Sequence, residues 1–109
     1  MITITMTRKQ DEITAFEISG HAESGPYGYD LVCAAVSAVS FGTVNAIDRL
    51  FHVDMNIEQG EDGGYLSVQI PRNSNEEVRS HVQTLLEGML VSLETIERDY
   101  NQFIRILSN

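Results

Sequence analysis

A long apolar stripe between Val78 and Ile96 limits the possible folds more strongly than any other part of the sequence. Its apolar side chains recur at intervals of three and four residues, which is the spacing of one face of an α-helix. Asparagines at 73 and 75 and glutamates at 76 and 77 precede the stripe, as expected where a helix begins. The sequence therefore predicts a helix from about residue 76 to residue 98. Its core-facing residues are Val78, Val82, Leu85, Leu86, Met89, Leu93 and Ile96.

Strands are predicted where apolar and polar residues alternate. Residues 2–6 and 14–19 show this alternation on either side of a polar turn at 8–11. Residues 53–57 and 66–70 show it again around a glycine-rich segment, which predicts a hairpin. Residues 103–107 are apolar at four of five positions, so we expect an interior strand or one covered on both faces.

A second helix is predicted over residues 31–51. Its expected core stripe consists of Val32, Val36, Val39, Ile47 and Leu50. A different face carries the small residues Ala35, Ala38, Gly42 and Ala46. Glycine inside a helix costs about 1 kcal/mol relative to alanine, so we expect Gly42 to permit close packing against another helix.

The resulting order is strand, strand, helix, strand, strand, helix, strand. Five strands and two amphipathic helices predict an α+β two-layer sandwich with a mostly antiparallel sheet. The chain of 109 residues suits one domain spanning 1–109, and no repeat or linker divides it.

The chemistry of the chain is concentrated between His21 and its single cysteine, Cys33. If Asp30 is the N-cap of the helix, Cys33 lies in the first turn, where unpaired N–H groups and the helix dipole favour a thiolate. His21 could then accept the thiol proton, and the N–H groups of residues 31–33 could stabilise an oxyanion. The alternative is that Cys33 is an ordinary apolar residue of a buried helix start. Its expected place at the margin of the core stripe would leave it half exposed, which suits a nucleophile better.

Several neighbours could support this pair. Residues 22–29, which include Ala22, Gly25, Pro26 and Gly28, are typical of a loop and could act as a substrate clamp. Asp30 could orient His21 or only cap the helix. Ser37 lies one turn beyond Cys33 and could hydrogen-bond near the site or back to the helix carbonyl of Cys33.

Other functional classes have less support. His52 and His81 stand alone, no paired C-x-x-C or H-x-x-x-H spacing occurs, and no phosphate-binding loop is present, so we expect neither a metal nor a cofactor. The formal net charge of −9 argues against a nucleic-acid binder and is compatible with a basic protein partner.

The expected location is the cytoplasm. The single cysteine allows no internal disulfide and fits a reducing compartment. Residues 1–6 lack the features of a signal peptide. We expect no apolar run to reach the roughly 20 residues needed to span a membrane, and therefore no membrane partner.

The segments Gly20-His21-Ala22 and Asp30-Leu31-Val32-Cys33-Ala34-Ala35-Val36-Ser37 together resemble the bacterial ribosomal-processing cysteine proteases. The resemblance also extends to the length of the chain and the order of its elements. It implies an endopeptidase that removes the N-terminal extension of large-subunit ribosomal protein number twenty-seven, with Cys33 as nucleophile and His21 as general base. It further implies a homodimer, and a hydrophobic pocket near the first helix for an aromatic pair that precedes the scissile bond.

Two other functions remain open at this point. The chain could be a non-catalytic binding or assembly factor that holds a ribosomal protein without cutting it. A thiol-based redox enzyme is the other alternative, weakened by the absence of a second cysteine.

Overall fold

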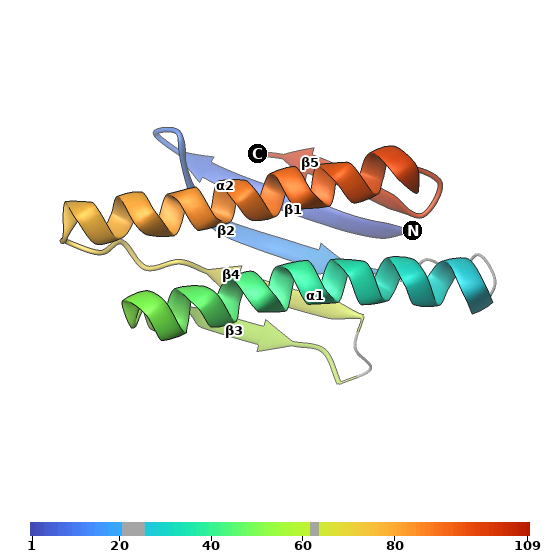
Figure 1. Ribbon diagram of the computed structural model, residues 1–109, viewed down its shortest axis with the longest axis horizontal. Coiled ribbons are helices and arrows are strands. Elements are labelled where there is room, and N and C mark those ends of the chain that lie inside the picture. Colours follow the sequence, from blue (N-terminus) through green and yellow to red (C-terminus); the bar gives the residue numbers. More distant parts are fainter. Residues whose placement is uncertain (21–25, 62–63) are drawn as a thin grey trace.

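The computed structural model describes residues 1–20, 26–61 and 64–109, with the backbone alone considered for residues 26–30. Two helices and five strands make up this part of the chain (Figure 1). In chain order they are β1 (Ile2–Lys9), β2 (Glu12–Ser19), α1 (Pro26–Phe51), β3 (Asn56–Gln59), β4 (Tyr65–Gln69), α2 (Glu76–Asp99) and β5 (Ile104–Ser108).

The strands form one sheet in the order β3-β4-β2-β1-β5. Every neighbouring pair is antiparallel except β1 and β5, which are parallel. Both helices cover the same face of the sheet and run side by side in opposite directions (Figure 1). The predicted α+β two-layer sandwich with a mostly antiparallel sheet is therefore confirmed.

The core lies between the sheet and the helices. Ile2, Ile4 and Met6 of β1 are buried, while the threonines that alternate with them are only partly covered. Four members of the predicted α2 stripe are buried, namely Val82, Leu86, Met89 and Leu93. The start of α2 is also as predicted, because the side chain of Asn75 accepts a hydrogen bond from the N–H of Val78 at 3.0 Å.

The predicted start of α1 is wrong. The helix begins at Pro26, so Pro26 and Gly28 belong to the helix rather than to a loop, and Asp30 is not its N-cap. Proline suits the first helical position because an N–H group there would have no intrahelical acceptor. The remainder of the predicted loop, including Ala22 and Gly25, lies outside the described residues.

The outward face of α1 also differs from expectation. Leu50, predicted in the core, is 64% exposed. A Cβ atom added at Gly42 would meet no atom within 4 Å, so this glycine does not serve close packing against any described residue. The segment Leu31–Phe51 is long and apolar enough to cross a membrane by length and composition, contrary to the sequence-based expectation. Val32, Val36 and Ile47 of the same segment are buried in the core, as in the packed helix of a globular domain.

The last strand, β5, is an edge strand with exposed side chains, so the prediction of a strand that is interior or covered on both faces is wrong. Its Ile104 is buried, but Leu107 is 43% exposed. The third strand is also shorter than predicted: Val53 and Met55 are buried in the connection that precedes it, and pairing with β4 starts at Asn56.

Candidate active site

A cavity of about 360 Å³ lies where α1 passes over one end of the sheet. The start of β1, the end of β2 and the hairpin between β3 and β4 form its strand side. Cys33 and Ser37 both line its helix side. The full lining is Ile2, Ile18, Gly20, Cys33, Val36, Ser37, Ser40, Phe41, Gln59, Gly60, Gly64, Tyr65 and Leu66.

Gly20 fixes the strand side of this cavity. Its φ of +93° is a conformation that residues with side chains rarely adopt, and a Cβ atom there would collide with the carbonyl oxygen of Met1. Its N–H donates a 3.0 Å hydrogen bond to the carbonyl of Gly64, which extends the contact between β2 and β4 beyond the last ladder pair. His21 is the next residue in the chain and lies outside the described part. The chain therefore leaves β2 toward His21 from the wall of the cavity that contains Cys33.

Cys33 is half-buried and packs against the edge of the core, as the sequence predicted for a residue at the margin of the stripe. It lies seven residues after Pro26, two turns into α1 rather than in the first turn. The dipole effect falls off within the first turn of a helix, so the predicted stabilisation of a thiolate by the helix start is wrong. The N–H groups of residues 31–33 are likewise inside the helix, where i→i−4 bonding uses them, and they do not form an oxyanion hole.

Two serines lie on the same side of α1 as Cys33. Ser37 is exposed and lines the cavity. Within the described part of the chain, its hydroxyl makes no hydrogen bond back to the helix carbonyl of Cys33. Ser40 is buried and donates a 2.7 Å hydrogen bond to the carbonyl of Val36, so it is part of the helix packing.

The apolar walls of the cavity were not identified from the sequence. Phe41 lies eight residues after Cys33, a little over two helical turns, so helix periodicity was a signal that could have identified it. Ile18 and Leu66 come from paired strands whose contact with α1 only the topology reveals. Tyr65 at the rim donates a 3.0 Å hydrogen bond to the carboxylate of Glu17, which raises the pKa of the Tyr65 phenol.

The described residues contain no group of three or more histidine, cysteine or acidic side chains arranged to hold a metal ion. The cavity offers a partly buried thiol beside an apolar surface. A thiol in such a setting can act as a nucleophile toward a substrate that binds the apolar walls.

The fold and this cavity describe a small α+β domain with a partly buried thiol lining a ligand-sized pocket, an arrangement compatible with a thiol hydrolase. The family model described as "Cysteine protease Prp" matches residues 1–105. The chain therefore belongs to the family of the ribosomal processing cysteine protease Prp, and it is a cysteine protease.

Relatives and solved structures agree with this assignment. The ribosomal processing cysteine protease Prp of Bacillus subtilis (strain 168) is 47% identical over 110 residues, covering 100% of this chain and 98% of that protein. The protein of the same name from Staphylococcus aureus (strain Mu50) is 41% identical over 107 residues, covering 97% of each.

Two crystal structures of the S. aureus protease match over 100% of both chains. The one with a covalently linked product peptide has a TM-score of 0.87 at 40% identity. The one with a substrate peptide has a TM-score of 0.85 at 37% identity. Membership of a protease family argues against the two alternatives raised by the sequence, a binding factor without catalytic activity and a redox enzyme.

Proposed function

We propose that this chain is an endopeptidase that removes the N-terminal extension of large-subunit ribosomal protein number twenty-seven in the cytoplasm. Cys33 is the nucleophile and His21 the general base. The observation that carries the proposal is that Cys33 and Gly20, the residue directly before His21, line one cavity. The names of the relatives, which are ribosomal processing proteases, support the choice of substrate.

In the proposed reaction, His21 accepts the thiol proton and the sulfur of Cys33 attacks the carbonyl carbon of the scissile peptide bond. The C–N bond breaks as His21 returns the proton to the leaving amine, which leaves an acyl group on the sulfur. Water then attacks this thioester, with His21 as the base, and releases the acid product and the free thiol. Because Cys33 is two turns into α1, activation depends on His21 rather than on the helix start.

The apolar part of the cavity suits an aromatic side chain of the substrate. Ile18, Phe41 and Leu66 contribute to it, and its volume of about 360 Å³ is within the range of ligand pockets. An aromatic pair before the scissile bond, as the family resemblance implies, would place one ring there. The net charge of −9 would also attract a basic ribosomal-protein tail over long range.

The supporting roles follow from position. Ser37, one turn beyond Cys33, contacts the substrate or the histidine through its hydroxyl, and Asp30 orients His21. Residues 22–29, with Ala22, Gly25, Pro26 and Gly28, act as the substrate clamp, with Pro26 and Gly28 in the first turn of α1. Ser37→Ala and Asp30→Asn should each reduce kcat/KM by about tenfold, far less than loss of the nucleophile.

The decisive experiment measures product masses after incubation with the extended ribosomal protein. Cys33→Ala and His21→Gln should yield no truncated product over times in which the unmodified chain completes the cleavage. His81→Gln is the matched control, since His81 is exposed on α2 and does not line the cavity, and it should cut normally. Cleavage by the Cys33→Ala chain would disprove the proposed nucleophile. Retained substrate binding without cleavage by the unmodified chain would instead favour a binding factor.

A homodimer is the second part of the proposal. Leu31, Ala38 and Gly42 are exposed on one side of α1, because separations of seven and eleven residues return to the same helix face. Leu31 is 62% exposed, so a second copy would bury apolar area there. Sedimentation of Gly42→Arg should show a monomer. Gly88→Arg, at an equally open position on α2, should leave the dimer intact, and a monomeric unmodified chain would refute this part alone.

A further inference from the structure

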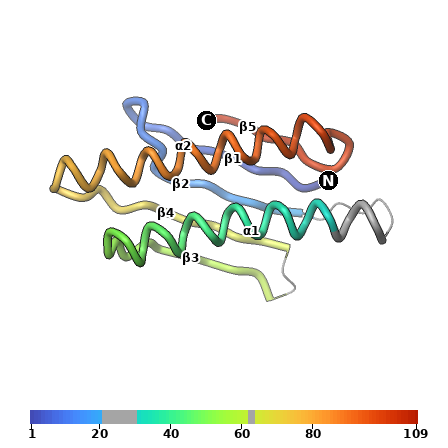
Figure 2. The backbone as a smooth tube through the Cα atoms, in the orientation of Figure 1, coloured from blue at the N-terminus to red at the C-terminus, as the bar shows by residue number. Residues whose placement is uncertain are grey.

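A second cavity, of about 710 Å³, lies at the end of the sheet opposite to Cys33. Its lining includes the turn between β1 and β2, the connection between β4 and α2, and the segment after α1. Figure 2 shows that these three segments lie at the same end of the sheet. Its lining is Lys9, Gln10, Glu12, Ile13, Thr14, Val53, Ile70, Pro71, Arg72, Asn73, Arg79, Val82 and Gln83. It shares no residue with the cavity that contains Cys33.

The lining of this cavity has the opposite charge from the chain as a whole. Lys9, Arg72 and Arg79 are three of only seven basic residues in a chain with sixteen acidic ones. Among the described residues that line it, Glu12 is the only acidic one. Within the described part of the chain, the side chains of Lys9 and Arg72 have no ion-pair partner. The cavity therefore carries cationic groups that can bind an anion.

Apolar side chains form the interior of the cavity. Ile13, Val53 and Val82 are buried core residues, and Ile70 is partly buried against them. Lys9 and Arg72, by contrast, are exposed. The site thus combines an apolar interior with charged side chains at its surface, which is the composition of a pocket for an amphipathic anion.

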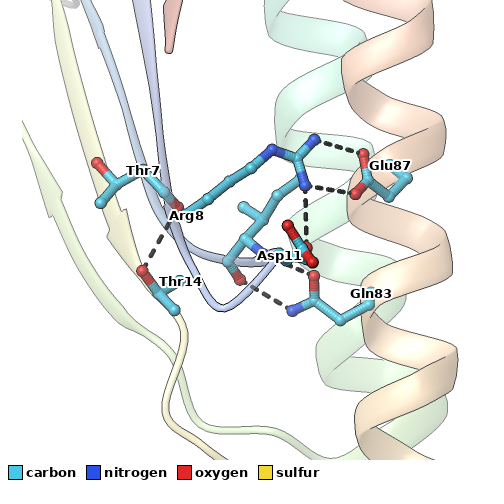
Figure 3. Close-up of polar contacts among 7 residues, drawn as sticks. Thr7, Arg8, Asp11, Thr14, Gln83 and Glu87 are labelled. Atoms are coloured by element: carbon cyan, nitrogen blue, oxygen red, sulfur yellow. Dashed lines mark hydrogen bonds and ion pairs between the residues drawn. The ribbon is translucent and has the colours of Figure 1, made fainter. Parts of the chain in front are cut away.

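Hydrogen bonds hold the walls in place without a ligand. The side chain of Gln83 accepts from the N–H of Ile13 at 2.7 Å and donates to the carbonyl of the same residue at 2.9 Å, which joins α2 to β2 (Figure 3). Nη1 of Arg79 donates to the carbonyl of Asn73 at 2.7 Å. This bond uses one of five guanidinium N–H groups and fixes the side chain beside the cavity. Because the walls are already ordered, binding a ligand does not incur the entropy cost of ordering them.

We propose that this cavity is a binding site for a small organic anion that has a phosphate, sulfonate or carboxylate head and an apolar body. Lys9 and Arg72 bind the head, and the body packs on the accessible apolar side chains of the lining, Ile70 and Pro71, next to the buried Ile13, Val53 and Val82. The proposal is independent of peptidase activity, because binding is measured directly.

The test is a titration of the full chain with 8-anilinonaphthalene-1-sulfonate, followed through backbone amide shifts by NMR. Saturable shifts should occur at Thr14, Asn73 and Gln83. The Lys9→Gln/Arg72→Gln variant should bind the probe about tenfold more weakly, because charge-assisted hydrogen bonds to the sulfonate are lost. Arg98→Gln/Arg105→Gln removes the same total charge at exposed positions outside both cavities and should bind like the unmodified chain.

Three results would overturn the proposal. The first is that shifts are confined to residues around Cys33 or to the exposed side of α1. The second is equal weakening by both double variants, which would show a general charge effect. The third is that inorganic phosphate binds as tightly as the probe, which would show that the apolar interior contributes nothing. The expected result is that phosphate binds much more weakly.

Discussion

The guanidinium of Arg8, near the end of β1, donates two hydrogen bonds to the carboxylate of Glu87 in α2, at 2.6 and 2.8 Å (Figure 3). The same guanidinium also donates to the backbone carbonyl of Asp11 in the β1–β2 turn at 3.2 Å. Arg8 therefore connects the helix layer to the sheet and to its first turn. These bonds hold the pKa of the Glu87 carboxyl below its ordinary value, because they favour the charged form.

This ion pair predicts a pH-dependent contribution to stability. Because the pKa of Glu87 is lower in the folded state, the contribution is complete above the ordinary glutamate pKa of the unfolded chain and is lost as the pH falls through the lower folded value. The side chains of Arg8 and Glu87 are 32% and 44% exposed, so the effect should be small. Glu87→Gln should lower Tm by a few degrees at pH 7 and have no effect at strongly acidic pH.

Thermal unfolding between pH 2 and pH 7 checks this prediction. Glu94→Gln is a suitable control, because Glu94 is an exposed carboxylate of α2 that acts on Arg8 only through long-range attraction. Its Tm change should be smaller than that of Glu87→Gln. If the difference between the unmodified chain and Glu87→Gln is the same at both ends of the pH range, the hydrogen-bonded carboxylate is not the cause.

The parts of the fold that were predictable from sequence depend on local periodicity. The α2 stripe repeats over a whole helix, and Asn75 marks its start, so both the element and its first residue could be predicted. The start of α1 could not, because proline and glycine are typical of loops while proline is equally suited to the first helical position.

Long-range relationships explain the remaining differences. The apolar residues of β5 indicate a strand. Its parallel pairing with β1 at the sheet edge, however, depends on how α2 carries the chain across the sheet from β4 to β5. For the same reason Cys33 could be identified as a candidate nucleophile from its own neighbours, whereas the strand residues Ile18 and Leu66 beside it could not. Gly42 was expected to pack against another helix, but which face of α1 packs against the rest of the fold is set by the tertiary arrangement and not by local spacing.

Gly20 predicts a coupling between strand geometry and activity. Gly20→Ala should lower the free energy of unfolding by about 1–3 kcal/mol, because the positive φ and the contact with the carbonyl of Met1 both disfavour a Cβ atom. It should also reduce kcat/KM at temperatures where the variant remains folded, since a shift of the backbone at position 20 would move the proposed base, His21. Urea denaturation and peptide cleavage measure the two effects.

Gly88→Ala is the control for this substitution. Gly88 lies in α2, where an added Cβ atom meets nothing described within 4 Å. Alanine there should raise the free energy of unfolding by about 0.5–1 kcal/mol through helix propensity and leave kcat/KM unchanged. A Gly20→Ala chain with the stability and activity of the unmodified protein would show that the strand end tolerates a different backbone path.

Phe41→Ala is expected to weaken substrate binding, measured by KM, without slowing the chemical step, measured by kcat. It lines the cavity two turns beyond Cys33, so Phe41→Ala enlarges the apolar wall without removing the thiol. KM for a peptide with an aromatic residue before the scissile bond should rise about tenfold, with little change in kcat, because the lost contact is present in both the ground state and the transition state. A peptide with alanine at that position should be cleaved almost equally by both enzymes.

Phe51→Ala provides the matched control for Phe41. Phe51 is also partly buried in α1, but it stacks on His81 with ring centroids 5.2 Å apart and does not line the cavity. Its replacement should destabilise the protein to a similar extent while leaving KM unchanged, so general loosening of α1 can be separated from loss of the pocket wall. If the Phe41→Ala enzyme keeps the full preference for the aromatic peptide, the substrate ring binds elsewhere and the cavity is not its pocket.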